Sequence, residues 1–144
     1  MDGYLVRTAN WQDDGRALKL IRETVFIGEQ GIPPELEWDE FDTNCTHLLA
    51  IDTLQNPIGT ARLLPAGSIG RMAVLKYWRG KRVGSALMES LLEEALVRQL
   101  PLVTLNAQTH AAGFYTRFGF RRVENEFLDA GIPHVRMVLQ LRAI

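Results

Sequence analysis

The chain has 144 residues, about the length of one ordinary domain, and 16 Lys and Arg against 17 Asp and Glu give a formal net charge of -1. Hydrophobic residues make up 47% and charged residues 23%, proportions typical of folded globular proteins rather than disordered ones. The balanced charge does not indicate a general nucleic-acid-binding protein. We therefore expect one folded domain over residues 1–144.

The cysteine count and the lack of long apolar runs indicate which cellular compartment and which stabilising groups to expect. Cys45 has no second cysteine for a disulfide, and with His47 alone it lacks the spacing of a metal site, so we expect a small structural residue and no metal. The first residues contain no signal-like segment, and no stretch reaches the roughly 18 apolar residues of a membrane span. We expect a cytoplasmic protein with neither a membrane nor a nucleic-acid partner.

The first part of the chain predicts a strand, a helix and an acidic loop. Residues 4–8 alternate as a strand does, and Asn10 is placed to cap a helix over residues 11–27 that ends near Gly28. After a Gly- and Pro-containing break, residues 35–42 include five acidic side chains. This stretch either attracts a cationic acceptor or forms a solvated turn whose aromatic residues seal the core.

The rest of the chain predicts strands arranged around one long helix, whose apolar residues recur every four positions from Val83 to Ala95. The last helix is short, with Thr109 as a possible cap and Gly119 as the expected stop. The predicted strands are 47–51, 58–64, 68–74, 102–107, 120–127 and 134–141.

A basic, glycine-containing turn at residues 79–84, RGKRVG, leads directly into the long helix. The N-terminus of a helix presents unpaired N–H groups and roughly half an elementary positive charge, so this turn suits a phosphate or pyrophosphate. The alternative is a solvated basic turn in which the glycines only permit a loop. Neither G-x-G-x-x-G nor G-K-[ST] is present, which argues against a nucleotide-binding domain that uses the turn for ATP.

Two motifs in this order resemble the GNAT superfamily of N-acetyltransferases. Arg79 and Gly84 match the first and last positions of the family signature R/Q-x-x-G-x-G/A, and Arg82 stands where the middle glycine is usual. Residues 111–120, AAGFYTRFGF, resemble the family segment A-x-x-L-Y-x-x-x-G-F. Segments 25–30 and 131–134 resemble the ElaA/YjcF-like branch in particular.

The resemblance implies an α/β (mixed α+β) GNAT fold. Its mixed central sheet has about seven strands with helices on both faces, and the fourth and fifth strands splay apart to admit acetyl-CoA as co-substrate. Backbone groups of Met72, Ala73 and Val74 would pair with the pantetheine arm, and Gln108 stands where the family often has an Asn that contacts the cofactor. The pyrophosphate would bind the turn formed by Arg79, Gly80, Lys81, Arg82, Val83, Gly84 and Ser85.

The resemblance also implies direct acetyl transfer to a primary amine in a ternary complex. Tyr115 matches the tyrosine thought to protonate the departing thiolate. His134 is the best candidate for a base that takes a proton from the amine, and the other acceptor-site candidates are Glu29, Asp39 and His110. The acceptor is a small-molecule or peptide amine, and a homodimer is possible. The alternative function is a CoA-binding sensor or interaction module without turnover.

Overall fold

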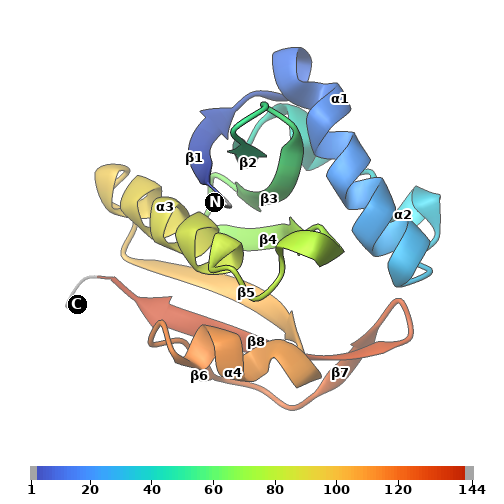
Figure 1. The fold of residues 1–144 in the computed structure, drawn as a ribbon. Helices are drawn as coiled ribbons and strands as arrows, with labels where there is room; N and C mark the ends of the chain where they lie inside the picture. Colours follow the sequence, from blue (N-terminus) through green and yellow to red (C-terminus); the bar gives the residue numbers. More distant parts are fainter. Residues whose placement is uncertain (1–2, 142–144) are drawn as a thin grey trace.

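A computed structural model describes residues 3–141, which form a mixed eight-stranded sheet with helices on both faces (Figure 1). No helix in this part of the chain is long and apolar enough to cross a membrane. The strands are β1 (Tyr4–Ala9), β2 (Thr46–Asp52), β3 (Pro57–Leu63), β4 (Ser68–Val74), β5 (Leu102–Gln108), β6 (Arg121–Arg122), β7 (Phe127–Asp129) and β8 (Ile132–Gln140). The α-helices are α1 (Trp11–Arg22), α2 (Pro34–Glu37), α3 (Val83–Val97) and α4 (Ala112–Thr116).

The sheet order is β1-β2-β3-β4-β5-β8-β6, and β7 pairs with β8. The β4–β5 pair is parallel, and the other pairs are antiparallel. The expected mixed sheet with helices on both faces is thus confirmed. It has eight strands rather than about seven because the single strand predicted over residues 120–127 is wrong: the exposed residues Glu124, Asn125 and Glu126 interrupt it, and only its two ends pair with β8.

Strand β2 shows why the sheet is covered on both faces. Side chains alternate across a strand, so Leu48 and Ala50 pack into the core beneath α3, while Leu49 and Ile51 pack beneath α1. All four are buried. In Figure 1, α1 and α3 lie on opposite sides of the β2–β4 sheet. This near-continuous apolar strand is typical of a sheet buried on both faces.

The first helix begins as predicted, but its last part differs from the prediction in helix type and in where it ends. The Asn10 side chain accepts a hydrogen bond from the Asp13 N–H at 2.7 Å, which confirms the predicted cap. The α-helix ends at Arg22 and continues as a π-helical segment, Glu23–Glu29, so Gly28 lies within the helix rather than at its end. π-Helical turns are rare and occur frequently at functional sites.

The last helix is shorter than predicted. A 3₁₀ turn over Thr109–Ala111 precedes α4, and the Thr109 hydroxyl donates to Glu126 at 3.0 Å instead of capping the helix. Gly119 follows the helix with a φ of +97°, and its N–H bonds the Thr116 carbonyl at 2.9 Å. This left-handed conformation favours glycine, which explains why the helix stops there.

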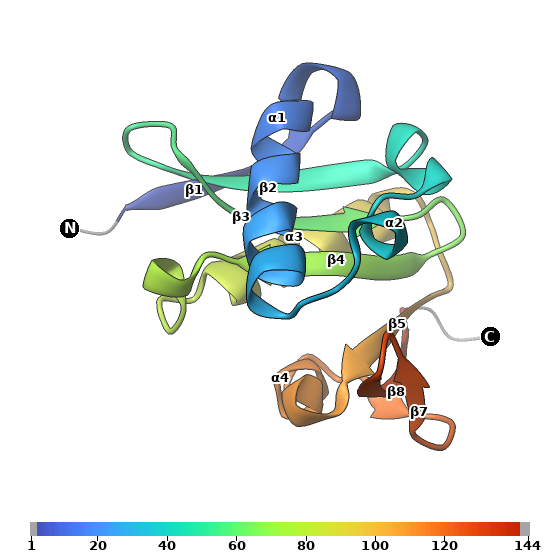
Figure 2. The ribbon, with the colours of Figure 1, turned by 90° about the vertical axis from the view of Figure 1, so that its right-hand side faces the viewer.

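Strands β4 and β5 splay apart as expected. Their register contains only two pairs, Ser68 with Thr104 and Ile69 with Leu105, although β4 continues for five further residues and β5 for three. The register with β3 shifts at this point, and Arg71 adopts a φ of +52°, so β4 carries a bulge. Bulges bend a strand and increase its twist. Figure 2 shows β5, β7, β8 and α4 standing apart from the β1–β4 part of the sheet.

Candidate active site

The divergence of β4 and β5 opens a cleft of about 510 Å³. Strand β4 lines it on one side, the ends of β5, β8 and α4 on another, and the π-helical segment lies above it. The cleft brings together nine of the residues that the sequence predicts for the site: Glu29, Met72, Ala73, Val74, Arg79, Gln108, His110, Tyr115 and His134.

The edge of β4 that faces the cleft has no partner strand in the described part of the chain beyond Ile69. It is available to an extended ligand, because an unpaired strand edge offers a row of N–H and C=O groups. The Val74 carbonyl accepts a hydrogen bond from Arg79 Nε at 2.9 Å. Met72 and Ala73 line the cleft between this contact and the bulge.

The turn before α3 adopts the conformation that its glycine pattern favours. Arg82 immediately precedes the helix with a φ of +67°, a left-handed conformation suited to glycine, and its side chain does not cap the helix. Arg82 thus has the left-handed backbone conformation for which glycine is suited, at the position where the family signature usually has a glycine. The first N–H groups of α3, at Val83, Gly84 and Ser85, have no acceptor within the helix. The turn and these groups follow Arg79 directly, at one end of the cleft.

The basic side chains around this turn already have contacts. Arg79 Nη2 lies 2.7 Å from Glu29 Oε1, so a residue predicted for the acceptor site pairs with one predicted for the cofactor site. Lys81 Nζ lies 4.2 Å from the centre of the Tyr77 ring. Residues 80–85 do not line the cleft, and the Val83 side chain is buried in the core, which leaves its backbone as the part able to meet a ligand.

Tyr115 projects from α4 into the wall of the cleft opposite β4. Its ring packs edge-on against Phe114 and Phe120, with centroids 5.0 and 6.2 Å away. Within residues 3–141, its hydroxyl has no hydrogen-bond partner, and burial raises the pKa of the phenol. The hydroxyl therefore keeps its proton and can donate it within the cleft.

His134 presents an unprotonated ring nitrogen when the imidazole is neutral. Its Nδ1 lies 2.7 Å from the Ile132 carbonyl, which can only accept, so Nδ1 carries the hydrogen and Nε2 is free of one. The ring stacks on Phe127 at 5.9 Å, which fixes its orientation. His110 also lines the cleft and is exposed.

Gln108 links β5 to the helical side of the cleft. Its Nε2 donates to Gln30 Oε1 at 2.8 Å, across 78 positions of sequence. Gln30 immediately follows the π-helical segment, so this bond joins the two diverging parts of the molecule. The sequence predicts Gln108 for the cofactor site but gives no sign of its partner.

The acidic stretch at residues 35–42 is largely neutralised by arginines. Glu37, Asp39 and Asp42 belong to a network with Arg22, Arg62 and Arg71, which we call the arginine–carboxylate network. Its ion pairs are Arg22–Glu37, Arg22–Asp42, Arg62–Asp39, Arg62–Asp42, Arg71–Glu37 and Arg71–Asp39, with N–O distances of 2.7 to 3.2 Å. Asp39 does not line the cleft. The stretch therefore does not present an open set of carboxylates to a cationic acceptor.

The deepest part of this network is nearly inaccessible to solvent. The side chains of Arg22, Glu37 and Asp42 are 1%, 2% and 2% exposed. Burial raises the pKa of Asp42, but the hydrogen bonds and charges of Arg22 and then Arg62 outweigh it, and the pKa falls below its usual value. Asp42 is thus a buried anion that depends on its arginine partners.

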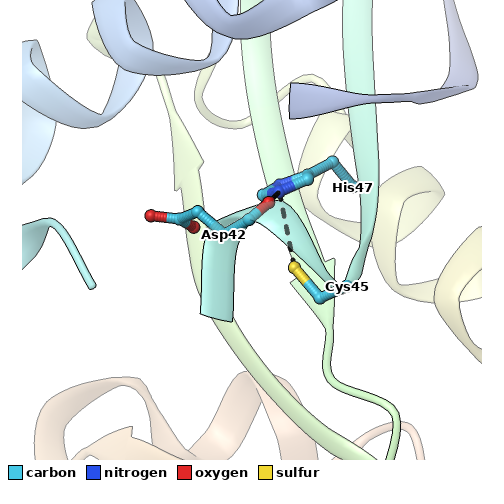
Figure 3. Close-up of side chains that lie close together, drawn as sticks. All are labelled: Asp42, Cys45 and His47. Carbon is cyan, nitrogen blue, oxygen red and sulfur yellow. Dashed lines mark hydrogen bonds between the residues drawn. The ribbon is translucent and has the colours of Figure 1, made fainter. Parts of the chain in front are cut away.

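Asp42, Cys45 and His47 place possible metal ligands within 4.8 Å of one another (Figure 3). The donors do not fit a metal site. His47 Nε2 lies 2.8 Å from the Asp42 backbone carbonyl, while the Asp42 carboxylate points away from the ring in Figure 3 and binds Arg22 and Arg62. Burial raises the pKa of Cys45 to about 11, so the sulfur is a protonated thiol rather than the thiolate that binds metals. The cluster anchors the segment that carries the network.

Sequence reasoning missed several charged and polar residues of the cleft, namely Gln30, Glu37, Arg62, Arg71 and Asp129. The two arginines carried a usable signal, because each stands inside an otherwise apolar predicted strand. A charge in such a position requires a buried partner. The identity of that partner depends on tertiary packing, which the sequence pattern does not give.

Comparison with known proteins identifies the family of the chain. A family model described as an acetyltransferase (GNAT) domain matches residues 24–141. YjcF, an uncharacterized N-acetyltransferase of Bacillus subtilis (strain 168), is 39% identical over 122 residues, which cover 82% of this chain and 86% of YjcF. Protein ElaA of Escherichia coli (strain K12) is 32% identical over 134 residues, which cover 87% of this chain and 86% of ElaA.

Solved structures of other proteins have the same overall fold. The crystal structure of Escherichia coli ElaA has a TM-score of 0.84 and 28% identity, covering 94% of this chain and 99% of that one. The structure of an acyl-CoA N-acyltransferase from Pseudomonas aeruginosa has a TM-score of 0.85 and 30% identity, with coverage of 94% and 99%. The chain therefore belongs to the GNAT acetyltransferase family, and its relatives include ElaA and YjcF, the branch that its sequence motifs predict.

Proposed function

We propose that the protein is an N-acetyltransferase that transfers the acetyl group of acetyl-CoA directly to a primary amine. The observation that carries this proposal is that one cleft holds both the unpaired edge of β4 and the hydroxyl of Tyr115. Membership of the acetyltransferase family supports a CoA thioester as the donor. The donor supplies an activated acetyl group, and the chain supplies positioning and proton transfer.

Donor binding uses backbone groups on both sides of the turn before α3. Met72, Ala73 and Val74 offer the edge of β4 to the pantetheine arm, which is bound as an added strand. The unpaired N–H groups at the start of α3 bind the pyrophosphate. Arg79 lies between these two regions and turns from Glu29 toward the phosphate oxygens.

Acetyl transfer then needs two proton movements, at two different side chains of the cleft wall opposite β4. The amine nitrogen attacks the thioester carbonyl carbon, a C–N bond forms and the C–S bond breaks. The Tyr115 hydroxyl, whose pKa burial raises above the reference value of about 10, keeps its proton until the thiolate departs and then donates it to the sulfur. His134 Nε2 accepts the proton that the amine loses.

Calorimetric titration with acetyl-CoA, with ATP and NADPH as controls, tests donor binding. We expect micromolar affinity for acetyl-CoA alone. Release of free CoA thiol in the presence of a panel of primary amines then tests turnover. Binding without release for any amine would favour the CoA-binding module, and absence of binding by folded protein would remove the proposal.

A further inference from the structure

Arg71 occupies the most unusual backbone position in the cleft wall. It lies in the bulge of β4, its φ is +52°, and it directly precedes Met72 of the proposed donor site. A non-glycine residue in this conformation is disfavoured and needs support from its surroundings. Such outliers cluster at functional sites, which indicates a functional role for the Arg71 side chain.

The Arg71 guanidinium is held firmly on one side. Its Nε contacts the Glu37 carboxylate at 3.1 Å and the Glu37 carbonyl at 3.3 Å, and its Nη2 contacts the Glu37 carbonyl at 2.9 Å and Asp39 at 3.2 Å. Within residues 3–141, Nη1 has no hydrogen-bond partner. The side chain is 26% exposed and lines the cleft. A preorganised guanidinium thus keeps its Nη1 amino group, with two N–H donors, for a ligand.

The two carboxylates that bind Arg71 are also bound by other arginines. Glu37 also pairs with Arg22, and Asp39 also pairs with Arg62. Their negative charge is therefore shared, and Glu37 is nearly inaccessible to a ligand. Arg71 consequently presents positive charge to the cleft on the β4 side.

The other side of the cleft has the opposite character. Asp129, at the end of β7, and His134, on β8, both line it. Asp129 is exposed, and His134 offers the unprotonated Nε2. The cleft beyond Met72 thus has a cationic wall on β4 and an anionic, proton-accepting wall on β7 and β8. A small molecule with one charge of each sign complements these walls.

We propose that the acceptor is a small amino carboxylate, such as an amino acid, whose carboxylate binds Arg71. This inference rests on the proposed function and assigns the acceptor class within the same site. The acceptor ammonium faces Asp129 and His134, releases one proton to solvent before attack, and gives the next to His134 Nε2 as the C–N bond forms. Because Arg71 and Met72 are consecutive residues, one small molecule can reach both the guanidinium and the thioester.

Amino acids and their carboxamides provide a matched pair of acceptor probes, because each pair has the same side chain and amine and exchanges the carboxylate for an uncharged group. The amides have the lower amine pKa and therefore more free amine, so a preference for the acids does not arise from amine protonation. We first measure acetyl-CoA binding by calorimetry and then CoA release with both sets. We expect kcat/KM to favour the acids by about tenfold or more, since a site built to bind a polar group discriminates against analogues that lack it.

Variants at Arg71 separate recognition from support of the fold. Arg71→Gln removes the charge and Arg71→Lys keeps it, while Arg16→Gln alters an exposed arginine of α1 and serves as the control. We expect Arg71→Gln to abolish the preference for acids without changing acetyl-CoA affinity, and Arg71→Lys to retain part of it. A purely structural role would instead lower activity with acids and amides equally. Arg71→Lys keeps the test valid if the Gln variant does not fold.

Each other outcome overturns the inference. Equal or better activity with the amides, or no activity with either set despite acetyl-CoA binding, would exclude a small amino carboxylate and leave the acetyltransferase proposal intact. Better activity with amides would favour a peptide N-terminus as acceptor. Failure to bind acetyl-CoA would remove both the proposed function and this inference.

Discussion

The hydroxyl of Tyr115 is available for the proton transfer proposed above, because the rest of its side chain serves packing. Phe114 and Phe120 hold the ring, and the hydroxyl has no other partner in the described chain. Burial raises the pKa of the phenol, so the proton stays bound to a pH above the usual value of about 10. The phenol thus stays protonated, and able to donate its proton, throughout the neutral pH range.

Tyr115→Phe should therefore lower turnover about 10²–10⁴-fold while leaving acetyl-CoA affinity unchanged, because the ring packing is kept and only the proton donor is lost. Stopped-flow or steady-state detection of free CoA measures turnover, and calorimetry measures affinity. Tyr77→Phe is the matched control, since Tyr77 is 69% exposed. Equal turnover in the Tyr115 variant and wild type would remove this residue from the mechanism.

Helix α3 and strand β3 approach each other closely at Gly59. A Cβ at this position would lie 3.1 Å from Val83 Cγ1, 3.2 Å from Leu87 Cδ1 and 3.3 Å from the Ala73 carbonyl. These neighbours belong to the first turns of α3 and to β4, the two elements proposed to bind the donor. The absence of a side chain at Gly59 thus sets the position of the helix N-terminus.

Gly59→Ala should destabilise the fold by about 1–3 kcal/mol, because the added methyl group overpacks the core. It should also weaken acetyl-CoA binding, since Val83 is the first residue of α3. Urea unfolding and calorimetry measure the two effects. Gly15→Ala in α1 is the control, because its Cβ would meet nothing within 4 Å and alanine favours a helix. Equal stability of the two variants would contradict this account.

The sequence predicts most elements because their local patterns agree with their tertiary roles. The apolar repeat of α3, the alternation of β1 and the Asn10 cap needed no distant partner to be recognised. The elements that sequence reasoning missed depend on contacts across the fold. The break between β6 and β7 and the π-helical turn after Arg22 are examples, because neither has a strong local signal.

The arginine–carboxylate network joins α1, the acidic stretch and strands β3 and β4 across the whole N-terminal part of the molecule. Asp42 is its central anion, bound by both Arg22 and Arg62. Its pKa is lowered in the folded state, so the stability it contributes is present above the unfolded value of about 3.9 and is lost as the pH falls through the folded pKa.

Asp42→Asn should lower the free energy of unfolding by about 3 kcal/mol at neutral pH, because it leaves two buried arginines incompletely paired. The difference from wild type should shrink below about pH 4, as wild type itself becomes protonated. Urea unfolding at several pH values measures it. Glu40→Gln, an exposed change in the same stretch, should have little effect at any pH. A difference that stays constant down to pH 2 would contradict the ionic role of Asp42.

The cleft as a whole was only partly predictable. The two family motifs contain Arg79 and Tyr115, and both residues line the cleft, because each motif carries its own local backbone geometry. The proposed acceptor end combines residues from α2, β4, β7 and β8, far apart in sequence. Arg71 in particular owes its position in the cleft wall to a bulge, which depends on the register between β3 and β4.

The ion pair between Arg79 and Glu29 should also affect how binding of the proposed anionic donor responds to ionic strength. An anion that binds Arg79 replaces a carboxylate 2.7 Å away, so one ion pair is exchanged for another. The added salt screens both pairs, and its effects partly cancel. The turn contains three basic residues, Arg79, Lys81 and Arg82. Because of the exchange at Arg79, the affinity for the anion should fall less steeply with salt concentration than three cationic side chains alone would predict.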